Sequence, residues 1–399
     1  MSGPNAAARY AAYQAAFAGR ALPLAFVDLR AFDANVARTA VRAAGKPVRI
    51  ATKSLRVPAL IRRVLAANPV YRGLMAYHPA EAVWLAQQGF TDILLGYPCV
   101  ADAQIEALLA AVRDGATITA MVDLPEHVER LGQAATRMGT VLPVCLDVDM
   151  SSRFAGLHFG VRRSAITTPV QALALYRQIE SYAGLRLEGV MGYEAQIAGV
   201  PDAVPGQGPK NAALRALKAA SAGEVAQRRA EVVQALRAAG APLRFVNGGG
   251  TGSFETTGRE DAVTELAAGS AFYAPALFDG YKAFSYEPAA GYAIEVTRKP
   301  APGIYTCAGG GYVASGEVGL AKQPVVWLPA GAQLLPLEGA GEVQTPVRYD
   351  GALALGDPVI LRHAKAGELM ERARTVLLVE GDQVVDEVPT YRGEGLCFY

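Results

Sequence analysis

A lysine at the end of an apolar run is the first residue of this chain whose type and place could do chemistry. Lys53 directly follows residues 48–52, Val-Arg-Ile-Ala-Thr, which have the composition of a strand. A lysine at the end of a buried strand is partly desolvated, and desolvation disfavours the ammonium form. The neutral amine is the form that condenses with a carbonyl group. Lys53 is therefore a candidate for a covalent bond to a carbonyl compound, against the ordinary alternative of a solvated surface lysine.

A glycine-rich segment supplies the second group of candidate residues. Residues 247–252 read Asn-Gly-Gly-Gly-Thr-Gly and follow another short apolar run. Successive glycines leave backbone N–H groups free to converge on an anion, and the threonine adds a hydroxyl. A flexible turn is the alternative, but turns rarely need three consecutive glycines followed by Thr-Gly. The segment favours phosphate binding, with the candidates Asn247, Gly249, Gly250 and Thr251.

The elements that must position these residues alternate between short β-type runs and helical stretches from about residue 25 to residue 275. Eight strands are expected, at 49–52, 73–77, 93–97, 117–122, 144–149, 189–193, 244–247 and 264–272. Eight strands in this order predict a closed (β/α)8 barrel of the TIM type, with a doubly wound sheet as the alternative. Lys53 then follows the first strand and the glycines follow the seventh, so together they bracket a phosphorylated aldehyde across the barrel mouth. Pyridoxal 5'-phosphate (PLP) is such a compound.

The remainder of the chain predicts a second domain. After about residue 285 the sequence changes to β runs punctuated by Gly and Pro, which is typical of a mostly antiparallel β domain. We therefore expect an α/β chain with three parts. They are an N-terminal extension over residues 1–24 that packs with the C-terminal domain, a PLP-binding barrel over 25–280, and a smaller β-rich domain over 281–399.

Composition and charge narrow the class of partner. The 399 residues carry 38 Lys and Arg against 37 Asp and Glu, a formal charge of +1, so no overall field would recruit nucleic acid or an anionic membrane. Charged residues, Gly or Pro interrupt every apolar run before the roughly 20 residues that span a bilayer. The first residues lack the basic segment and apolar core of a secretory signal, which predicts a cytoplasmic protein. A small molecule is the expected partner.

Several segments in their order resemble the alanine-racemase-like PLP barrels of fold type III, and within them the D-threonine aldolase and D-serine dehydratase branch. The resemblance covers the whole barrel and rests on the order of the segments rather than on any single motif. The matching segments are residues 23–29, 32–36, 49–54, 81–82, 92–98, 146–156 and 248–252.

The resemblance implies roles for individual residues. Lys53 would bear the cofactor as a Schiff base, and Gly249, Gly250 and Thr251 would hold its phosphate. Arg153 stands where the family has an arginine that points at the cofactor or the substrate, with a surface ion pair as the alternative. In the segment that lines the family's cofactor pocket, Tyr193 would flank the ring and Gln196 would donate a hydrogen bond near it; simple packing is the alternative for both.

The resemblance also raises the question of a metal ion. In this branch a histidine and a cysteine or aspartate two residues later hold a divalent ion near the substrate hydroxyl, and the matching residues here are His363 and Lys365. An ammonium group has no lone pair to donate to a metal. The two-residue site is therefore broken, although Glu342 or Glu368 could compensate. His363 is then expected to act as a base, and Lys365 to replace the charge of the metal.

Taken together, the resemblance implies a PLP-dependent lyase that acts on small β-hydroxy D-amino acids by retro-aldol cleavage or by dehydration. An amino-acid racemase of the same fold is the alternative, with Tyr312 or Tyr391 as a second base. A PLP-carrier protein without turnover is the alternative from another class. Relatives commonly form dimers, so a homodimer is expected by resemblance only.

Overall fold

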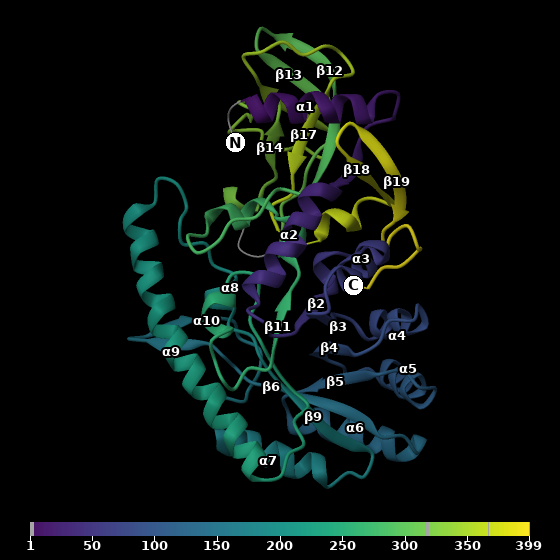
Figure 1. The fold of residues 1–399 in the computed structure, drawn as a ribbon, viewed down its shortest axis with the longest axis vertical. Helices are drawn as coiled ribbons and strands as arrows, with labels where there is room; N and C mark the ends of the chain where they lie inside the picture. Colours follow the sequence, from purple (N-terminus) through teal and green to yellow (C-terminus); the bar gives the residue numbers. More distant parts are fainter. Residues whose placement is uncertain (1–3, 316–318, 366, 399) are drawn as a thin grey trace.

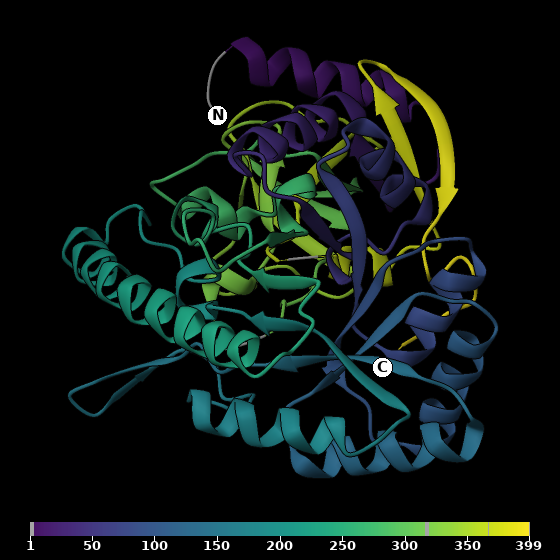
Figure 2. The same ribbon diagram turned by 60° about the horizontal axis from the view of Figure 1, so that its bottom comes forward.

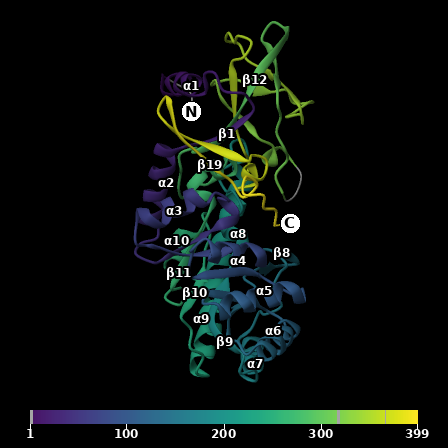
Figure 3. The same cartoon turned by 90° about the vertical axis from the view of Figure 1, so that its right-hand side faces the viewer.

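A closed barrel and a large open sheet lie one above the other along the long axis of the molecule (Figures 1 and 3). The computed structural model describes residues 4–315, 319–365 and 367–398. No helix in these ranges is both long enough and apolar enough to cross a bilayer.

The barrel contains eight parallel strands, and it closes where the last strand pairs with the first. In spatial order the strands are β2 (Val48–Ala51), β3 (Tyr71–Ala76), β4 (Ile93–Pro98), β5 (Ile118–Val122), β6 (Leu142–Asp147), β9 (Leu185–Gly192), β10 (Phe245–Gly248) and β11 (Glu265–Ala268). Each of the eight expected strands overlaps one of these, so the predicted (β/α)8 barrel is confirmed. The eighth ends earlier than expected, because the chain turns at Gly269 into the short helix α11 (Ser270–Tyr273). A Cβ on Gly269 would lie 2.6 Å from the Oγ of Ser54.

Helices cover the outside of the barrel (Figure 2). The longer ones are α2 (Leu29–Arg42), α3 (Pro58–Ala67), α4 (Pro79–Gln87), α5 (Asp102–Arg113), α6 (Pro125–Met138), α7 (Pro169–Glu180) and the 31-residue α9 (Gly208–Ala238). Two single-turn helices, α8 (Ala195–Ala198) and α10 (Phe254–Thr257), lie in loops at the barrel mouth. Four of the longer helices, α3, α4, α6 and α7, begin with proline, whose missing N–H would be unpaired there in any case.

The second sheet has nine strands, joined in the order β15-β16-β13-β12-β1-β18-β19, with β17 paired to β12 and β14. Its bounds are β1 (Leu24–Asp28), β12 (Ala290–Ala301), β13 (Ile304–Ala308), β14 (Val325–Leu328), β15 (Gln333–Leu334), β16 (Gln344–Arg348), β17 (Pro358–Arg362), β18 (Thr375–Glu380) and β19 (Gln383–Pro389). The predicted mostly-β C-terminal region is confirmed.

Strand β1 corrects the expected start of the barrel at residue 25. It lies between β12, to which it is antiparallel, and β18, to which it is parallel, so it belongs to the second sheet. An almost wholly buried strand shows a continuous apolar run in any sheet, and the run therefore did not tell which sheet would take it. The N-terminal helix α1 (Pro4–Phe17) packs on the same sheet, where the rings of Tyr13 and Phe17 contact the ring of Phe26.

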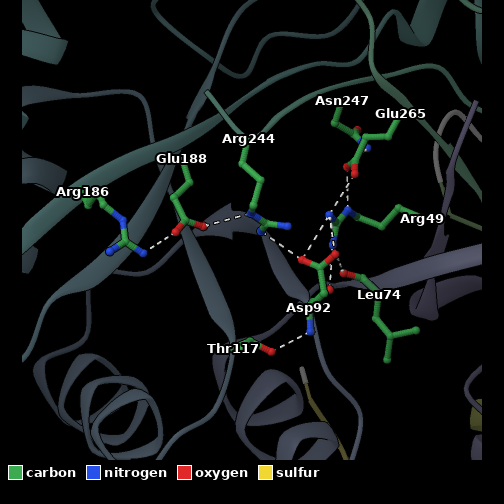
Figure 4. Close-up of polar contacts among 9 residues, drawn as sticks. All are labelled: Arg49, Leu74, Asp92, Thr117, Arg186, Glu188, Arg244, Asn247 and Glu265. Carbon is green, nitrogen blue, oxygen red and sulfur yellow. Dashed lines mark hydrogen bonds and ion pairs between the residues drawn. The ribbon is translucent and has the colours of Figure 1, made fainter. Parts of the chain in front are cut away.

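A buried arginine fills the barrel at the end opposite the mouth (Figure 4). Arg49 is fully buried, and its guanidinium pairs with Glu265 at 2.6 Å and with Asp92 at 3.3 Å. Asp92 also pairs with Arg244 at 3.0 Å, which in turn reaches Glu188 at 3.3 Å. Asp92 and Arg244 directly precede β4 and β10, so the network closes the amino-terminal end of the strands. Taking a charge out of water is costly, and this network of carboxylates offsets that cost.

We predict that Arg49→Ala lowers the free energy of unfolding by about 3–5 kcal/mol, because it leaves the Glu265 carboxylate buried without its partner. Urea unfolding of the cofactor-free protein measures the change. Arg153→Ala is the matched control, since Arg153 is exposed and its loss should change stability by no more than about 0.5 kcal/mol. Equal stabilities of the two variants would contradict a stabilising role for the network.

Candidate active site

The candidate site is a cavity of about 170 Å³ at the mouth of the barrel, where the carboxyl ends of the strands meet. The barrel contributes Lys53, Tyr97, Tyr193 and the glycine-rich loop, and the second sheet contributes Lys365 through the segment that follows β17. Carboxyl ends of barrel strands are where TIM-type enzymes place their chemistry.

Lys53 lies in a single 3₁₀ turn, Thr52–Ser54, that directly follows β2. Its Nζ donates a hydrogen bond of 2.9 Å to the hydroxyl of Tyr97, near the end of β4. Burial opposes ionisation of Tyr97, but the charges of Lys53 and Arg163 outweigh it and hold the pKa of this phenol below its usual value. Tyr97 was not expected in the site; its place at a strand end, like that of Lys53, was the available signal.

Glu81 holds the wall behind Lys53. This fully buried carboxylate on α4 accepts hydrogen bonds from the Thr52 hydroxyl at 2.6 Å and from the Tyr77 N–H at 2.7 Å. The Tyr391 hydroxyl, from the C-terminal segment, donates a third at 2.9 Å. Burial raises the pKa of Glu81 to about 7, although these hydrogen bonds partly offset the effect. One carboxylate thereby ties together the Lys53 turn, the end of β3 and the last residues of the chain.

The glycine-rich loop forms the opposite wall, where the cavity is lined by Asn247, Gly249, Gly250 and Thr251. Gly249 has a φ of +80°, which favours glycine, and a Cβ on Gly252 would lie 2.3 Å from the carbonyl oxygen of Ala198. Asn247 donates its amide to Glu265 at 2.9 Å, which connects the cavity to the network around Arg49.

A buried carboxylate also organises this loop. Glu194 accepts hydrogen bonds from Ser253 and Thr257, both at 2.6 Å, from the Gly249 N–H at 3.3 Å and from Arg229 at 2.8 Å. The Gly250 N–H donates to Ser253 at 3.0 Å. Two N–H groups that were expected to face a phosphate are therefore engaged within the protein.

Other donors on this wall remain suited to an anion. The Thr251 hydroxyl accepts a hydrogen bond from the Ala271 N–H at 3.1 Å, which leaves its own proton to donate. Ser270, the first residue of α11, lines the same face of the cavity.

The arginine of the site is Arg163, which corrects the expectation for Arg153. Arg153 is exposed on a hairpin formed by β7 (Ser152–Phe154) and β8 (Leu157–Phe159), which projects from the barrel (Figure 2). Arg163 lines the cavity, with its guanidinium 5.9 Å from the ring centroid of Tyr97 and 5.7 Å from that of Tyr193. The β7–β8 hairpin lies between β6 and Arg163 along the chain, so the arginine that reaches the mouth comes later in the sequence than Arg153.

Of Tyr193 and Gln196, only Tyr193 lines the cavity, while Gln196 lies behind the cavity wall. Tyr193 lines the cavity as expected, and burial together with the neighbouring Glu194 raises its pKa to about 12. Gln196 does not line it; the side chain is buried and donates to the Met150 carbonyl and to Ser221, at 2.5 and 2.9 Å. Gln196 therefore supports the backbone behind the site rather than meeting a ligand.

The structure also separates His363 from Lys365. Lys365 lines the cavity and its Nζ donates to the Ser315 carbonyl at 3.3 Å, whereas His363 is fully buried beside the ring of Tyr273 and does not line the cavity. Burial and the nearby cations, Lys322 first among them, lower the pKa of Lys365.

The glutamates considered as metal ligands and the tyrosines considered as a racemase base also lie away from this cavity. Glu368 accepts a hydrogen bond from the Ser315 N–H, and Glu342 and Tyr312 line a second, larger cavity beside the open sheet. Tyr391 gives its hydroxyl to Glu81. Within the described ranges, no group of three or more His, Cys, Asp or Glu side chains is arranged to hold a metal ion.

The charges that line the cavity all have one sign. Lys53, Arg163 and Lys365 line it, and no Asp or Glu among the described residues does. The carboxylates of Glu81 and Glu194 lie one layer behind, where they hold the walls in place. The arrangement suits an anionic ligand that presents a carbonyl group to Lys53.

Asp147 is a buried carboxyl group at the end of β6, behind Arg163. Burial and the neighbouring Asp123 raise its pKa to about 8, although Arg163 opposes the shift. Between its ordinary pKa near 4 and about 8, the folded protein therefore holds a proton here that the unfolded chain has lost. Stability from this group is complete below that window and is lost as the pH rises through it.

We predict that the free energy of unfolding of wild type falls relative to that of Asp147→Asn as the pH rises from about 5 to 7.5, by up to about 1.4 kcal/mol per pH unit. The asparagine stays neutral and removes the proton uptake. Urea unfolding of the cofactor-free proteins at several pH values measures this slope. Asp114→Asn, at a side chain 70% exposed, is the control and should show no such slope. A flat difference for Asp147→Asn would contradict the raised pKa.

Comparison with known proteins gives this geometry a family. Residues 27–276 match the model for the alanine racemase N-terminal domain. A 3-hydroxy-D-aspartate aldolase of Paracoccus denitrificans is 26% identical over 198 residues, which are 50% of this chain and 46% of the relative. A D-threonine aldolase of an Arthrobacter species is 27% identical over 287 residues, 70% of this chain and 69% of the relative. The chain thus matches about half the length of the first of these and about two thirds of the second.

Solved structures share the fold over almost the full length. A D-threonine aldolase from Filomicrobium marinum superposes with a TM-score of 0.79 at 21% identity, covering 94% of this chain and 95% of that one. A D-threo-3-hydroxyaspartate dehydratase from Delftia sp. HT23 gives 0.73 at 21% identity, covering 93% and 98%. An alanine racemase from Bacillus anthracis gives 0.65 at 16% identity, again over 93% and 98%. The match to the domain model covers well over half of the chain and confirms the resemblance seen in its segments: the chain belongs to the alanine racemase N-terminal domain family.

Proposed function

We propose that this protein is a PLP-dependent lyase acting on small β-hydroxy D-amino acids. The observation that carries the proposal is the cavity that Lys53 and the glycine-rich loop both line, in which the charged side chains among the described residues are three cations. A phosphate of about −2 and one substrate carboxylate roughly balance that charge. The aldolases and the dehydratase to which the chain is similar support the same reaction class.

The residues present fit PLP. Lys53 would hold the aldehyde carbon covalently, and Thr251 and Ser270 would donate to the phosphate on the opposite wall. The Thr251 hydroxyl, already fixed by the Ala271 N–H, has its proton free for that hydrogen bond. Tyr193 would flank the ring. When bound, PLP accepts the electron pair released by cleavage of a bond to the substrate Cα.

The chain's own residues position the substrate and move its protons. Arg163 and Lys365 would bind the substrate carboxylate, since charge-assisted hydrogen bonds to carboxylates are the strong ones. Retro-aldol cleavage needs an acceptor for the β-hydroxyl proton and dehydration needs a donor to the departing hydroxide. His363 does not line the cavity, so it is not assigned to either role.

Two alternatives have less support. A racemase needs a second acid–base group opposite Lys53, but Tyr391 donates to Glu81 and Tyr312 lines the other cavity. A PLP carrier without turnover has no use for the cations that the second sheet and the Arg163 segment bring to the mouth. The homodimer and the cytoplasmic location stay predictions.

We predict that the PLP-loaded protein cleaves at least one of D-threonine, D-3-hydroxyaspartate and D-serine, and that Lys53→Arg abolishes turnover. Arginine keeps the charge but cannot form the covalent bond to the aldehyde. Separate assays for aldehyde, keto acid and inverted amino acid distinguish aldolase, dehydratase and racemase. Borohydride reduction followed by mass spectrometry should place the pyridoxyl group on Lys53.

Lys299→Arg is the control for that experiment, because Lys299 is an exposed residue of β12 and its change should leave both readouts intact. An adduct on another lysine would overturn the assignment of Lys53. An adduct on Lys53 without any turnover would instead favour the carrier.

Lys365 carries a second prediction, since it stands where the resemblance implies a metal ligand. If its ammonium supplies the positive charge near the substrate, EDTA leaves kcat/KM unchanged. Lys365→Ala then lowers kcat/KM roughly tenfold to a hundredfold, the loss of one charge-assisted hydrogen bond. Metal analysis and assays with and without EDTA measure both effects, with Lys299→Ala as control. Activity that EDTA abolishes and manganese or zinc restores would overturn this role of Lys365.

A further inference from the structure

We propose that Tyr97 is a further catalytic residue, and that its phenol and the Lys53 amine act as one acid–base pair facing the substrate. The inference rests on the proposed function and deepens it. No role was predicted for Tyr97 from the sequence, although it stands at a strand end; the folded barrel brings it to Lys53.

The geometry brings the two groups together from separate strands. Lys53 follows β2 and Tyr97 belongs to β4, with β3 lying between these strands in the barrel. Their side chains nevertheless meet over the mouth, with 2.9 Å between the Lys53 Nζ and the Tyr97 hydroxyl oxygen. Both line the cavity, so a substrate that reaches Lys53 also reaches the phenol.

The groups around Tyr97 make it easier for its hydroxyl to lose a proton. Burial and Asp147 disfavour the phenolate, whereas Lys53, through charge and hydrogen bond, and Arg163 favour it. These opposing effects leave the phenol able to ionise below its ordinary pKa of about 10.

Tyr193 provides an internal comparison. It lines the same cavity and lies equally close to Arg163, yet burial and the adjacent Glu194 raise its pKa. The two phenols therefore differ in what they can do, because only Tyr97 has the lysine as a hydrogen-bond partner among the contacts of the described residues.

The proton step balances without another reactant. With substrate bound, Lys53 would be a free amine that accepts a proton from the substrate, so that a substrate O–H or C–H bond breaks and an N–H bond forms. A proton on Nζ can then pass to the phenolate oxygen, so that an N–H bond breaks and an O–H bond forms while the pair keeps its net charge. Tyr97 can return the proton to the substrate or to Lys53. Acid–base partners within hydrogen-bond reach of one another are what such a transfer requires.

Tyr97→Phe tests the pair with three readouts. In the cofactor-free protein, the ultraviolet titration of tyrosinate should lose one transition below pH of about 10, a transition that Tyr193→Phe retains. In the loaded enzyme, kcat should fall by about 10²–10⁴-fold and the limb of its pH profile that reports the pair should disappear. PLP should still bind and still be reduced onto Lys53, with an altered pH dependence of the reduction.

The outcomes separate this inference from the proposed function. Wild type that turns over no β-hydroxy D-amino acid would defeat the proposed function, while the tyrosinate titration and the reduction of the Lys53 adduct would still test the pair. A Tyr97→Phe variant that keeps the low tyrosinate transition and the wild-type pH dependence of reduction would overturn the inference. So would an active variant whose kcat and pH profile match those of wild type.

Discussion

The buried charge of Arg49 is the constraint on which the rest of the barrel depends. A guanidinium that is wholly removed from water needs carboxylates at fixed places, and here they come from the β11 strand and from the residue before β4. Satisfying one cation therefore fixes the relative positions of segments that are far apart in the sequence. Glu265 connects this network to the cavity wall. The carboxylate oxygen that pairs with Arg49 also accepts a hydrogen bond from the side-chain amide of Asn247. The closed end of the barrel and its open mouth are thus held by one network.

The mouth of the barrel also combines cations with buried carboxyl groups. Cations line the cavity, and Glu81 and Glu194 lie behind its two walls, each fully buried and each accepting several hydrogen bonds. A carboxylate placed inside the cavity would repel a phosphate or a carboxylate ligand. Placed one layer back, the carboxyl group still fixes the backbone that presents the donors, through the hydrogen bonds that it accepts. The cavity is therefore pre-organised for an anion before one binds.

The sequence could predict features that depend on neighbouring residues, but not those that depend on contacts between distant segments. Burial patterns are local, so all eight barrel strands were predictable, and so were Lys53 and the glycine-rich loop at their strand ends. The expected barrel began at residue 25 and so included most of β1, because a buried apolar run does not show which sheet will take it. Arg153 was expected in the site and Arg163 was not considered, because no local signal shows that the chain leaves the barrel in a hairpin and returns to the mouth at Arg163. Tyr97 and Glu81 act through partners 44 and 29 positions away along the chain, contacts that only the closed barrel creates.

The second sheet contributes to the candidate site rather than only supporting it. Lys365 reaches the cavity from the segment after β17, and the C-terminal segment places the Tyr391 hydroxyl on Glu81. The Tyr391 N–H also donates to the Arg56 carbonyl at 2.9 Å, just beyond the Lys53 turn, and the ring of Phe398 lies 6.2 Å from that of Tyr77 in the cavity wall. Because Glu81 accepts from Thr52 and from Tyr391 at once, a displacement of the C-terminal segment changes the support of the residue next to Lys53. The position of the Lys53 amine therefore depends on contacts that the barrel cannot make by itself.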